Sequence, residues 1–153
     1  MTMPLPIVVL QKATHEMYYP LWQLRNELFV RKAMKGLASF GDFIKEIEHH
    51  NNHFLAGLVG TDLVGYAQLT VMSSNSISLF VTTEQFNRRK GYGKQLVDAA
   101  FLWAIHSGYQ HVMAAIEQNN SAGIALIRRC TFVDQGVAPS KNGGLKNIYV
   151  RRA

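Results

Sequence analysis

A short stretch near the middle of the chain combines basic side chains with two glycines. It reads Arg88-Arg89-Lys90-Gly91-Tyr92-Gly93-Lys94 and directly precedes a long run of apolar residues at helical spacing. Glycine lets a backbone turn with positive φ and approach a ligand closely, and the first turn of a helix offers unpaired N–H groups. The stretch therefore predicts an anion cradle that suits a pyrophosphate.

Spacing separates this stretch from two common phosphate-binding motifs. It lacks the third glycine of a dinucleotide-binding fingerprint, and the chain contains no GxxxxGK[ST] motif. These two observations disfavour a dehydrogenase and a P-loop nucleotide-binding protein. An ordinary strand-to-helix turn with solvated basic residues is the alternative interpretation.

Histidine and carboxylate residues gather in a second stretch, Glu48-His49-His50-Asn51-Asn52-His53, which could offer ligands to zinc. Nothing else supplies a convincing fourth ligand, and the stretch crosses a predicted helix end, so we expect no metal site. Cys130 is the only cysteine and has no histidine next to it in sequence. It follows an apolar helical face, which favours a small buried side chain over a nucleophile.

Apolar periodicity predicts an alternation of helices and strands around these stretches. Helical spacing covers residues 16–32, 40–50, 93–106 and 121–129. Short apolar or β-branched runs predict strands at residues 7–10, 54–59, 63–72, 77–81, 111–116, 132–133 and 146–150, with a polar loop at 139–144. The order β-α-α-β-β-β-α-β-α-β-β predicts one mixed α/β domain over residues 1–153.

Amino-acid composition and charge limit the classes of molecule that the protein is expected to bind. The 16 basic and 10 acidic residues give a net charge of +6, which favours an anionic cofactor, acidic substrate, nucleic acid or membrane surface. The basic residues are scattered and match no recognition motif, so nucleic acid is not expected. The N-terminal apolar run is too short to span a bilayer, and no membrane partner is expected. A single cysteine excludes an intrachain disulfide, and the expected location is cytoplasmic.

Two motifs in this order resemble the GNAT family of acyl-CoA-dependent N-acetyltransferases. Arg88-x-x-Gly91-x-Gly93 is similar to the family's pyrophosphate signature, Q/R-x-x-G-x-G/A. The segment 120–132 resembles the family's N-x-x-A-I-x-L-Y-x-x-x-G-F, with Gly123, Ile127 and Thr131 replacing Ala, Tyr and Gly. The resemblance covers nearly the whole chain and implies a central, mostly antiparallel mixed sheet flanked by helices.

The resemblance also implies how the cosubstrate acetyl-CoA is held. Its pyrophosphate would bind the backbone N–H groups of Arg89, Lys90, Gly91, Tyr92, Gly93 and Lys94, with charge from Arg88 and Lys90. Its thioester would face backbone N–H groups at a splayed strand end formed by Leu79, Phe80 and Val81. Asn120 would contact the pantetheine arm or the loop beside it. Such preorganised donors stabilise the oxyanion that forms when an amine attacks.

The residues that would transfer protons follow less directly from the family resemblance than the residues that would bind acetyl-CoA. The family often protonates the leaving thiolate with a tyrosine at the position of Ile127, which isoleucine cannot replace; Tyr149, Ser121, Cys130 or water are the alternatives. A thiol pKa near ~8.5 makes the thiolate a tolerable leaving group. Residues 77–81 contain no acidic residue, so the candidate bases lie outside that strand. They are Glu48 and His49, with His50 and His53 beside them, and Glu84.

These features predict an N-acetyltransferase that moves an acetyl group from acetyl-CoA to a primary amine within a ternary complex. The acceptor is a small-molecule or peptide amine. Because Ile127 replaces the tyrosine and the strand carboxylate is missing, a non-catalytic acyl-CoA-binding module is the alternative. A homodimer that shares an edge strand is compatible with such a sheet.

Overall fold

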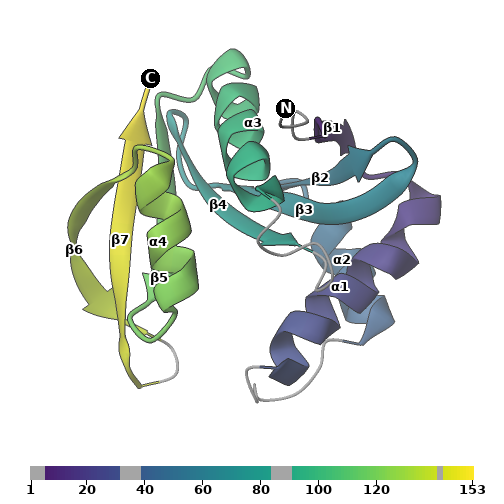
Figure 1. Cartoon of the computed structure of the whole chain (residues 1–153), viewed down its shortest axis with the longest axis horizontal. Helices are drawn as coiled ribbons and strands as arrows, with labels where there is room; N and C mark the ends of the chain where they lie inside the picture. Colours follow the sequence, from purple (N-terminus) through teal and green to yellow (C-terminus); the bar gives the residue numbers. More distant parts are fainter. Residues whose placement is uncertain (1–5, 32–38, 84–90, 141–142) are drawn as a thin grey trace, which may run out of the picture.

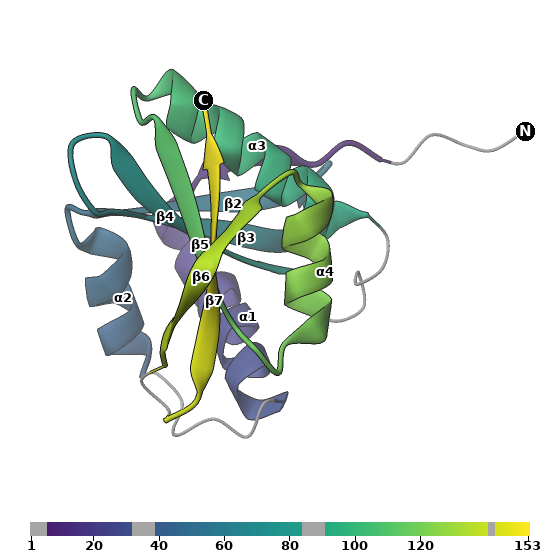
Figure 2. The same ribbon diagram turned by 90° about the vertical axis from the view of Figure 1, so that its left-hand side faces the viewer.

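The computed structural model describes residues 6–31, 39–83, 91–140 and 143–153, the side chains of 28–31 excepted. A seven-stranded sheet has the order β1-β2-β3-β4-β5-β7-β6 (Figures 1 and 2). The strands are β1 (Val9–Lys12), β2 (Asn52–Val59), β3 (Asp62–Val71), β4 (Ser76–Thr83), β5 (His111–Glu117), β6 (Val133–Pro139) and β7 (Leu145–Arg152). Neighbouring strands are antiparallel, except for the parallel pair β4 and β5.

Within the described residues, four α-helices and a short 3-10 helix connect these strands. They are η1 (His15–Met17), α1 (Tyr18–Arg31), α2 (Phe40–Glu48), α3 (Tyr92–His106) and α4 (Ser121–Arg129). The predicted element order and the mostly antiparallel mixed sheet are confirmed. In the part of the chain that the structure describes, no helix is both long and apolar enough to cross a membrane.

Each face of the sheet is covered by one pair of helices. On one face, α3 and α4 pack against β3, β4 and β5 through side chains that include Leu79, Phe101 and Ile127. On the other face, α1 and α2 pack through Leu21 and Phe43 against Tyr66 of β3 and its neighbours. Successive residues of a strand point to opposite faces. Leu79 of β4 therefore faces α3, and Phe80 lies on the α1 and α2 side, near Tyr66.

The strands β4 and β5 pair over three residues and then separate. The pairing joins residues 76–78 to residues 111–113, although β4 continues to Thr83 and β5 to Glu117. Each strand remains paired with its other neighbour, β3 or β7, and the two diverge in Figure 1. Beyond Ser78, the β5-facing edge of β4 therefore carries backbone polar groups that no described strand pairs. The structure thus contains the splayed strand end that the family resemblance implies.

Some observed element boundaries differ from those that the apolar periodicity predicts. Strand β1 covers Val9–Lys12 rather than residues 7–10, because the register with Leu55 to Leu58 of β2 selects those residues. A 3-10 turn precedes α1, which begins at Tyr18 rather than at residue 16. Strand β6 extends to Pro139, whereas the apolar pattern predicts only residues 132–133. It is a largely exposed edge strand with a register shift between Asp134 and Gly136, so it has no alternating apolar pattern.

Thr131 follows α4 in the left-handed conformation, with a φ of 63°. It stands where the motif described above has glycine. In this region the Cβ of an L-residue crowds the backbone, at a cost of about 1–2 kcal/mol. The Thr131 Oγ1 hydroxyl donates a hydrogen bond to the Cys130 carbonyl at 2.6 Å, so the side chain offsets part of this strain locally.

We predict that Thr131→Gly raises the free energy of unfolding by about 0.5–1 kcal/mol, because glycine relieves the strain at some entropic cost. Urea unfolding followed by circular dichroism measures the change. Thr131→Ala is the matched control, since it also loses the hydroxyl hydrogen bond but keeps the Cβ. Equal stabilities of the two variants would contradict strain at this position.

Candidate functional site

The N-terminus of α3 is the described part of the predicted anion cradle. Gly91 is the N-cap residue, with a φ of 81° in the left-handed region that favours glycine, and it offers no side-chain cap. The N–H groups of the first turn are therefore free of a capping side chain from Gly91, which suits an anion. Arg88, Arg89 and Lys90 lie outside the described residues.

The next three residues contribute to this cradle in different ways. A Cβ on Gly93 would lie 3.1 Å from Leu126 Cδ2, so α3 approaches α4 closely there. Tyr92 is buried in a cluster with Val8, which leaves its backbone as the part available to a ligand. The Lys94 ammonium donates to Asp98 Oδ2 at 2.8 Å, so its charge is shared with that carboxylate.

Asn120 is the N-cap of α4. Its Oδ1 accepts a hydrogen bond from the Gly123 N–H at 3.0 Å. A Cβ on Gly123 would lie 2.7 Å from Asn120 Nδ2, so glycine at this position leaves room for the capping side chain. In the structure Asn120 positions the start of α4, and its contact with a pantetheine arm stays a prediction.

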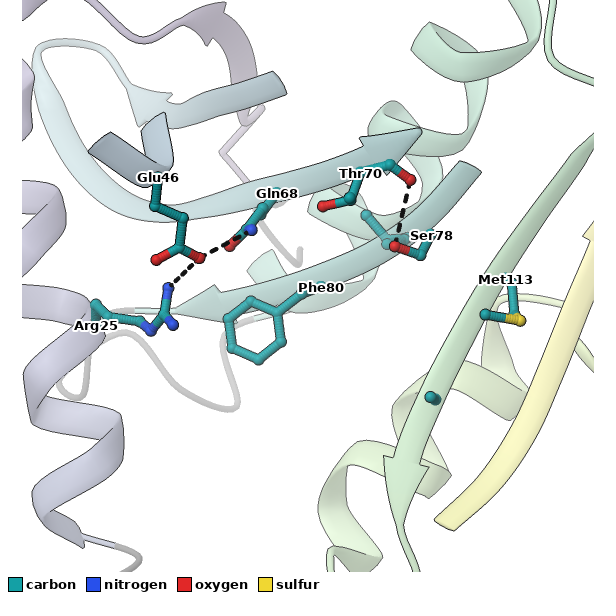
Figure 3. A pocket seen from close by; sticks show the side chains of 9 residues that line it. Arg25, Glu46, Gln68, Thr70, Ser78, Phe80 and Met113 are labelled. Atoms are coloured by element: carbon teal, nitrogen blue, oxygen red, sulfur yellow. Dashed lines mark hydrogen bonds and ion pairs between the residues drawn. The ribbon is translucent and has the colours of Figure 1, made fainter. Parts of the chain in front are cut away.

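A cavity of about 320 Å³ opens where β4 and β5 separate, on the α1 and α2 side of the sheet (Figure 3). Its walls come from both helices and from three strands. They are formed by Arg25, Glu46, Gln68, Thr70, Ser78, Leu79, Phe80, Met113 and Ala115. Two of the predicted thioester-facing residues, Leu79 and Phe80, are thus in the wall, and Val81 is the next residue along β4.

Glu46 is the one carboxylate among the described residues of this wall, and it lies in a polar network. The Arg25 guanidinium donates to Glu46 Oε1 at 3.0 Å, and Gln68 Nε2 donates to the same oxygen at 3.1 Å (Figure 3). Both charged side chains are mostly buried, with exposed fractions of 17% for Arg25 and 29% for Glu46. Tyr66 is buried beside this pair, and its pKa is raised because burial disfavours the phenolate.

Glu46 is not among the residues that the sequence predicts for the site, although its spacing carries a signal. Glu46 lies one helical turn after Phe43 and next to Ile47, the two buried residues of α2. The helical period therefore places Glu46 at the margin of the buried face, whereas Glu48 falls toward solvent. Arg25 and Gln68 could not be joined to it by spacing, because they come from α1 and β3.

The predicted bases at the end of α2 lie outside the cavity wall. Glu48 is half exposed and lies 3.6 Å from His15 Nε2. His49 is exposed, accepts a hydrogen bond at Nδ1 from the Asn51 N–H at 3.1 Å, and stacks on His50. The pKa of His53 is lowered, first by burial and then by the Lys12 charge. Glu84 lies outside the described residues.

Tyr149 of β7 is fully buried on the α3 and α4 side of the sheet, in the same cluster as Ile127. Its hydroxyl accepts a hydrogen bond from Asn147 Nδ2 at 3.1 Å. Asn147 Oδ1 in turn accepts from Gln118 Nε2 at 2.9 Å. Because the phenol is used as an acceptor here, its proton is available for donation.

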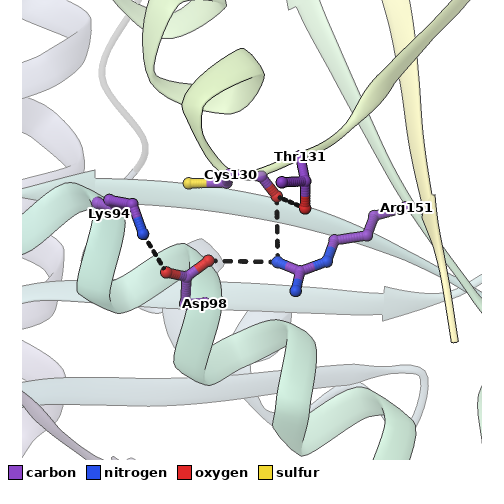
Figure 4. A network of polar contacts seen from close by, with 5 residues as sticks. All are labelled: Lys94, Asp98, Cys130, Thr131 and Arg151. Atoms are coloured by element: carbon purple, nitrogen blue, oxygen red, sulfur yellow. Dashed lines mark hydrogen bonds and ion pairs between the residues drawn. The ribbon is translucent and has the colours of Figure 1, made fainter.

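Cys130 ends α4 within a structural network rather than a reactive one (Figure 4). Arg151 of β7 donates to the Cys130 carbonyl at 3.0 Å and to Asp98 at 3.2 Å, and its guanidinium lies 3.9 Å from the Phe101 ring centroid. The Cys130 side chain is buried, which raises the pKa of its thiol to about 11. Among the described residues, no group of three or more His, Cys, Asp or Glu could hold a metal ion.

Comparison with known proteins gives one family and one fold. A model of the acetyltransferase (GNAT) family matches residues 14–132. No curated protein matches the chain in sequence. Three similar solved structures share 14–17% identity with the chain, and at that level the likeness shows the fold alone.

The first of these structures is yncA of Salmonella typhimurium with its cofactor acetyl-CoA (17% identity, 95% of this chain and 93% of that chain, TM-score 0.82). The second is the spermidine N-acetyltransferase of Vibrio cholerae with CoA and spermine (15% identity, 94% of this chain and 92% of that chain, TM-score 0.78). The third is the aminoglycoside acetyltransferase AAC(6')-Ib with coenzyme A (14% identity, 95% of this chain and 94% of that chain, TM-score 0.81).

We predict that Cys130 reacts at least about 100-fold more slowly with a disulfide reagent in the folded protein than in urea. Raising the thiol pKa from 9.0 to about 11 lowers the thiolate fraction near pH 8 by that factor, and burial adds a steric barrier. Absorbance of the released thiolate measures the rate. Equal rates in the two states would contradict the buried position.

Proposed function

Because the chain belongs to the acetyltransferase (GNAT) family, we propose that it transfers an acetyl group from acetyl-CoA to a primary amine by direct attack within a ternary complex. The observation that carries this proposal is the cavity at the separation of β4 and β5, which opens beside unpaired strand edge. A thioester inserted there would meet backbone donors on one side and an amine on the other. The similar structures solved with acetyl-CoA or CoA support the choice of donor.

The start of α3 suits the phosphate-rich part of the donor. Gly91 to Lys94 offer first-turn N–H groups with no side chain from Gly91 in the way. The close approach of Gly93 to Leu126 keeps this end of the helix narrow and fixed against α4. Arg88, Arg89 and Lys90 precede it directly in sequence and supply positive charge. The anchored handle would position the thioester before the reaction.

The splayed end of β4 suits the reacting carbonyl. Backbone N–H groups in the region of Leu79, Phe80 and Val81 would donate to the oxyanion that forms when the amine attacks. Such donors are already oriented by the pairing of β4 with β3, so they need little reorganisation during the reaction. The carbon–sulfur bond then breaks, and the electron pair leaves on the CoA sulfur.

Tyr149 is our proposed donor of a proton to that thiolate. Ile127, at the motif position of tyrosine, has no proton to give, and Tyr149 lies in the same buried cluster. Asn147 holds the phenol oxygen from one side and so fixes its orientation. Because a CoA thiolate is already a tolerable leaving group, this proton accelerates the step only modestly.

We predict that the Gly91→Val, Gly93→Val double variant binds CoA at least about tenfold more weakly. Valine is strained at the φ of Gly91, and a side chain at Gly93 would push α4 away, so charge-assisted N–H contacts to phosphate are lost. Titration calorimetry measures the affinity. Gly144→Ala is the matched control, because a Cβ there would meet open space. Parental affinity in the double variant would remove the cradle assignment.

We predict that Tyr149→Phe lowers kcat by about tenfold, chiefly below the pH at which a free thiol ionises, where the leaving group gains most from a donated proton. Release of free thiol, measured over a range of pH, follows the rate. Tyr19→Phe on the exposed part of α1 is the control. An unchanged kcat and pH profile in Tyr149→Phe would show that water protonates the thiolate.

A further inference from the structure

The cavity between β4 and β5 has a polar end and an apolar wall. In Figure 3, Arg25, Glu46 and Gln68 meet at one end, the Phe80 ring lies next to them, and Met113 stands across from them on β5. Phe80 is 40% exposed although it lies in the middle of a strand. An uncovered aromatic ring inside a concave wall is a surface that an apolar ligand can bury.

The Glu46 carboxylate has one oxygen engaged and one available. Both hydrogen bonds to it, from Arg25 and Gln68, fall on Oε1. Oε2 accepts none from the described residues, so it can accept an N–H from a ligand. The two donors also fix the orientation of the carboxylate, which lowers the entropy lost when a ligand binds.

The described lining of the cavity carries little net charge. Among those residues Glu46 is the only acidic one, and Arg25 already balances its charge. Other carboxylates of the described chain are engaged or exposed elsewhere; Asp98, for example, pairs with Lys94 and Arg151, and Asp42 is exposed on α2. A polyamine that enters such a cavity would leave most of its ammonium groups without a counter-charge, and the net charge of +6 would repel it further.

We propose that the acceptor is a small monoamine with an apolar or aromatic body, bound with its ammonium group on Glu46 and its body on Phe80 and Met113. This inference rests on the proposed acetyl transfer and names its substrate class. A volume of about 320 Å³ is at the small end for ligand pockets, which agrees with a compact acceptor.

The contact between the acceptor ammonium and Glu46 also provides a base for the proton that the ammonium must lose before the amine attacks the thioester. The ammonium gives one proton to Glu46 Oε2, which frees the nitrogen lone pair to attack the thioester carbonyl carbon. The carbon–sulfur bond breaks, the thiolate leaves with the electron pair, and it takes its proton from Tyr149. The attacking nitrogen loses a second proton as the amide forms, and this proton restores the Tyr149 phenol by way of water. Glu46 returns the first proton to water, so protons and electrons balance over the cycle.

A panel of acceptors tests the substrate class, with free-thiol release from acetyl-CoA as the readout. We expect kcat/KM for 2-phenylethylamine to exceed that for spermidine by at least about tenfold. A higher kcat/KM for spermidine than for 2-phenylethylamine overturns the proposal while leaving acetyl transfer intact. A higher kcat/KM for L-phenylalanine, which differs by its carboxylate, does the same. Absence of CoA binding in calorimetry, or of turnover with every amine, would instead sink the proposed function.

Substitutions on α2 test the role of Glu46. We expect Glu46→Gln to raise KM for 2-phenylethylamine about 10- to 100-fold, the range for losing one charge-assisted hydrogen bond. We also expect it to lower kcat, because the amide cannot take the ammonium proton, with CoA affinity unchanged. Glutamine keeps the size and can still accept from Arg25. Asp42→Asn removes an exposed carboxylate from the same helix and is the control. If Glu48→Gln causes the loss and Glu46→Gln does not, Glu46 is not the acceptor residue.

A gain of charge provides an independent test that does not depend on disturbing the Arg25 network. Ala115 lines the cavity from β5 and is exposed, so the fold tolerates a polar side chain there. We expect Ala115→Asp to shift the ratio of kcat/KM toward spermidine over 2-phenylethylamine by about tenfold, because it adds a second counter-charge. Ala115→Asn controls for size and polarity. An unchanged ratio in Ala115→Asp means that charge in this cavity does not select the acceptor, and it overturns the proposal.

Discussion

The separation of β4 from β5 beyond Ser78 is the constraint on which the rest of the molecule depends. Each strand pairs with its other neighbour over seven residues, against three residues between the two strands. The longer ladders therefore hold the strands apart, while α3 packs across both and keeps the halves joined. The free edge of β4 is costly in water-poor surroundings. A ligand that accepts hydrogen bonds from this edge would offset that cost.

The Arg25–Glu46 pair gives the cavity its chemical character. The two side chains are mostly buried, and a pair in such a position contributes less to stability than its Coulomb attraction suggests, because both charges lose water. Its value is geometric, since it joins α1, α2 and, through Gln68, β3 at one point. By contrast, Lys94 and Asp98 form a solvated pair on the surface of α3 that anchors Arg151 and the end of α4.

Tyr149, our proposed proton donor, lies in the same buried cluster as the motif position of tyrosine but comes from another element. Ile127 occupies the motif position of tyrosine on α4 and is buried among apolar side chains. Tyr149 reaches the same cluster from β7 and is oriented by Asn147. Thr131, another departure from the motif, keeps the left-handed backbone that glycine would adopt without strain.

The sequence by itself determined the order of elements and placed the starts of α3 and α4 within one residue of Tyr92 and Ser121. Those features depend on residues close in the chain, such as apolar periods and single glycine or asparagine positions. Tertiary structure decided that β6 is a long edge strand, that Glu48 lies outside the cavity and that Glu46 lies in its wall. The physical reason is that Glu46 is held in this wall by Arg25 and Gln68, which helix packing and strand pairing bring from 21 and 22 residues away.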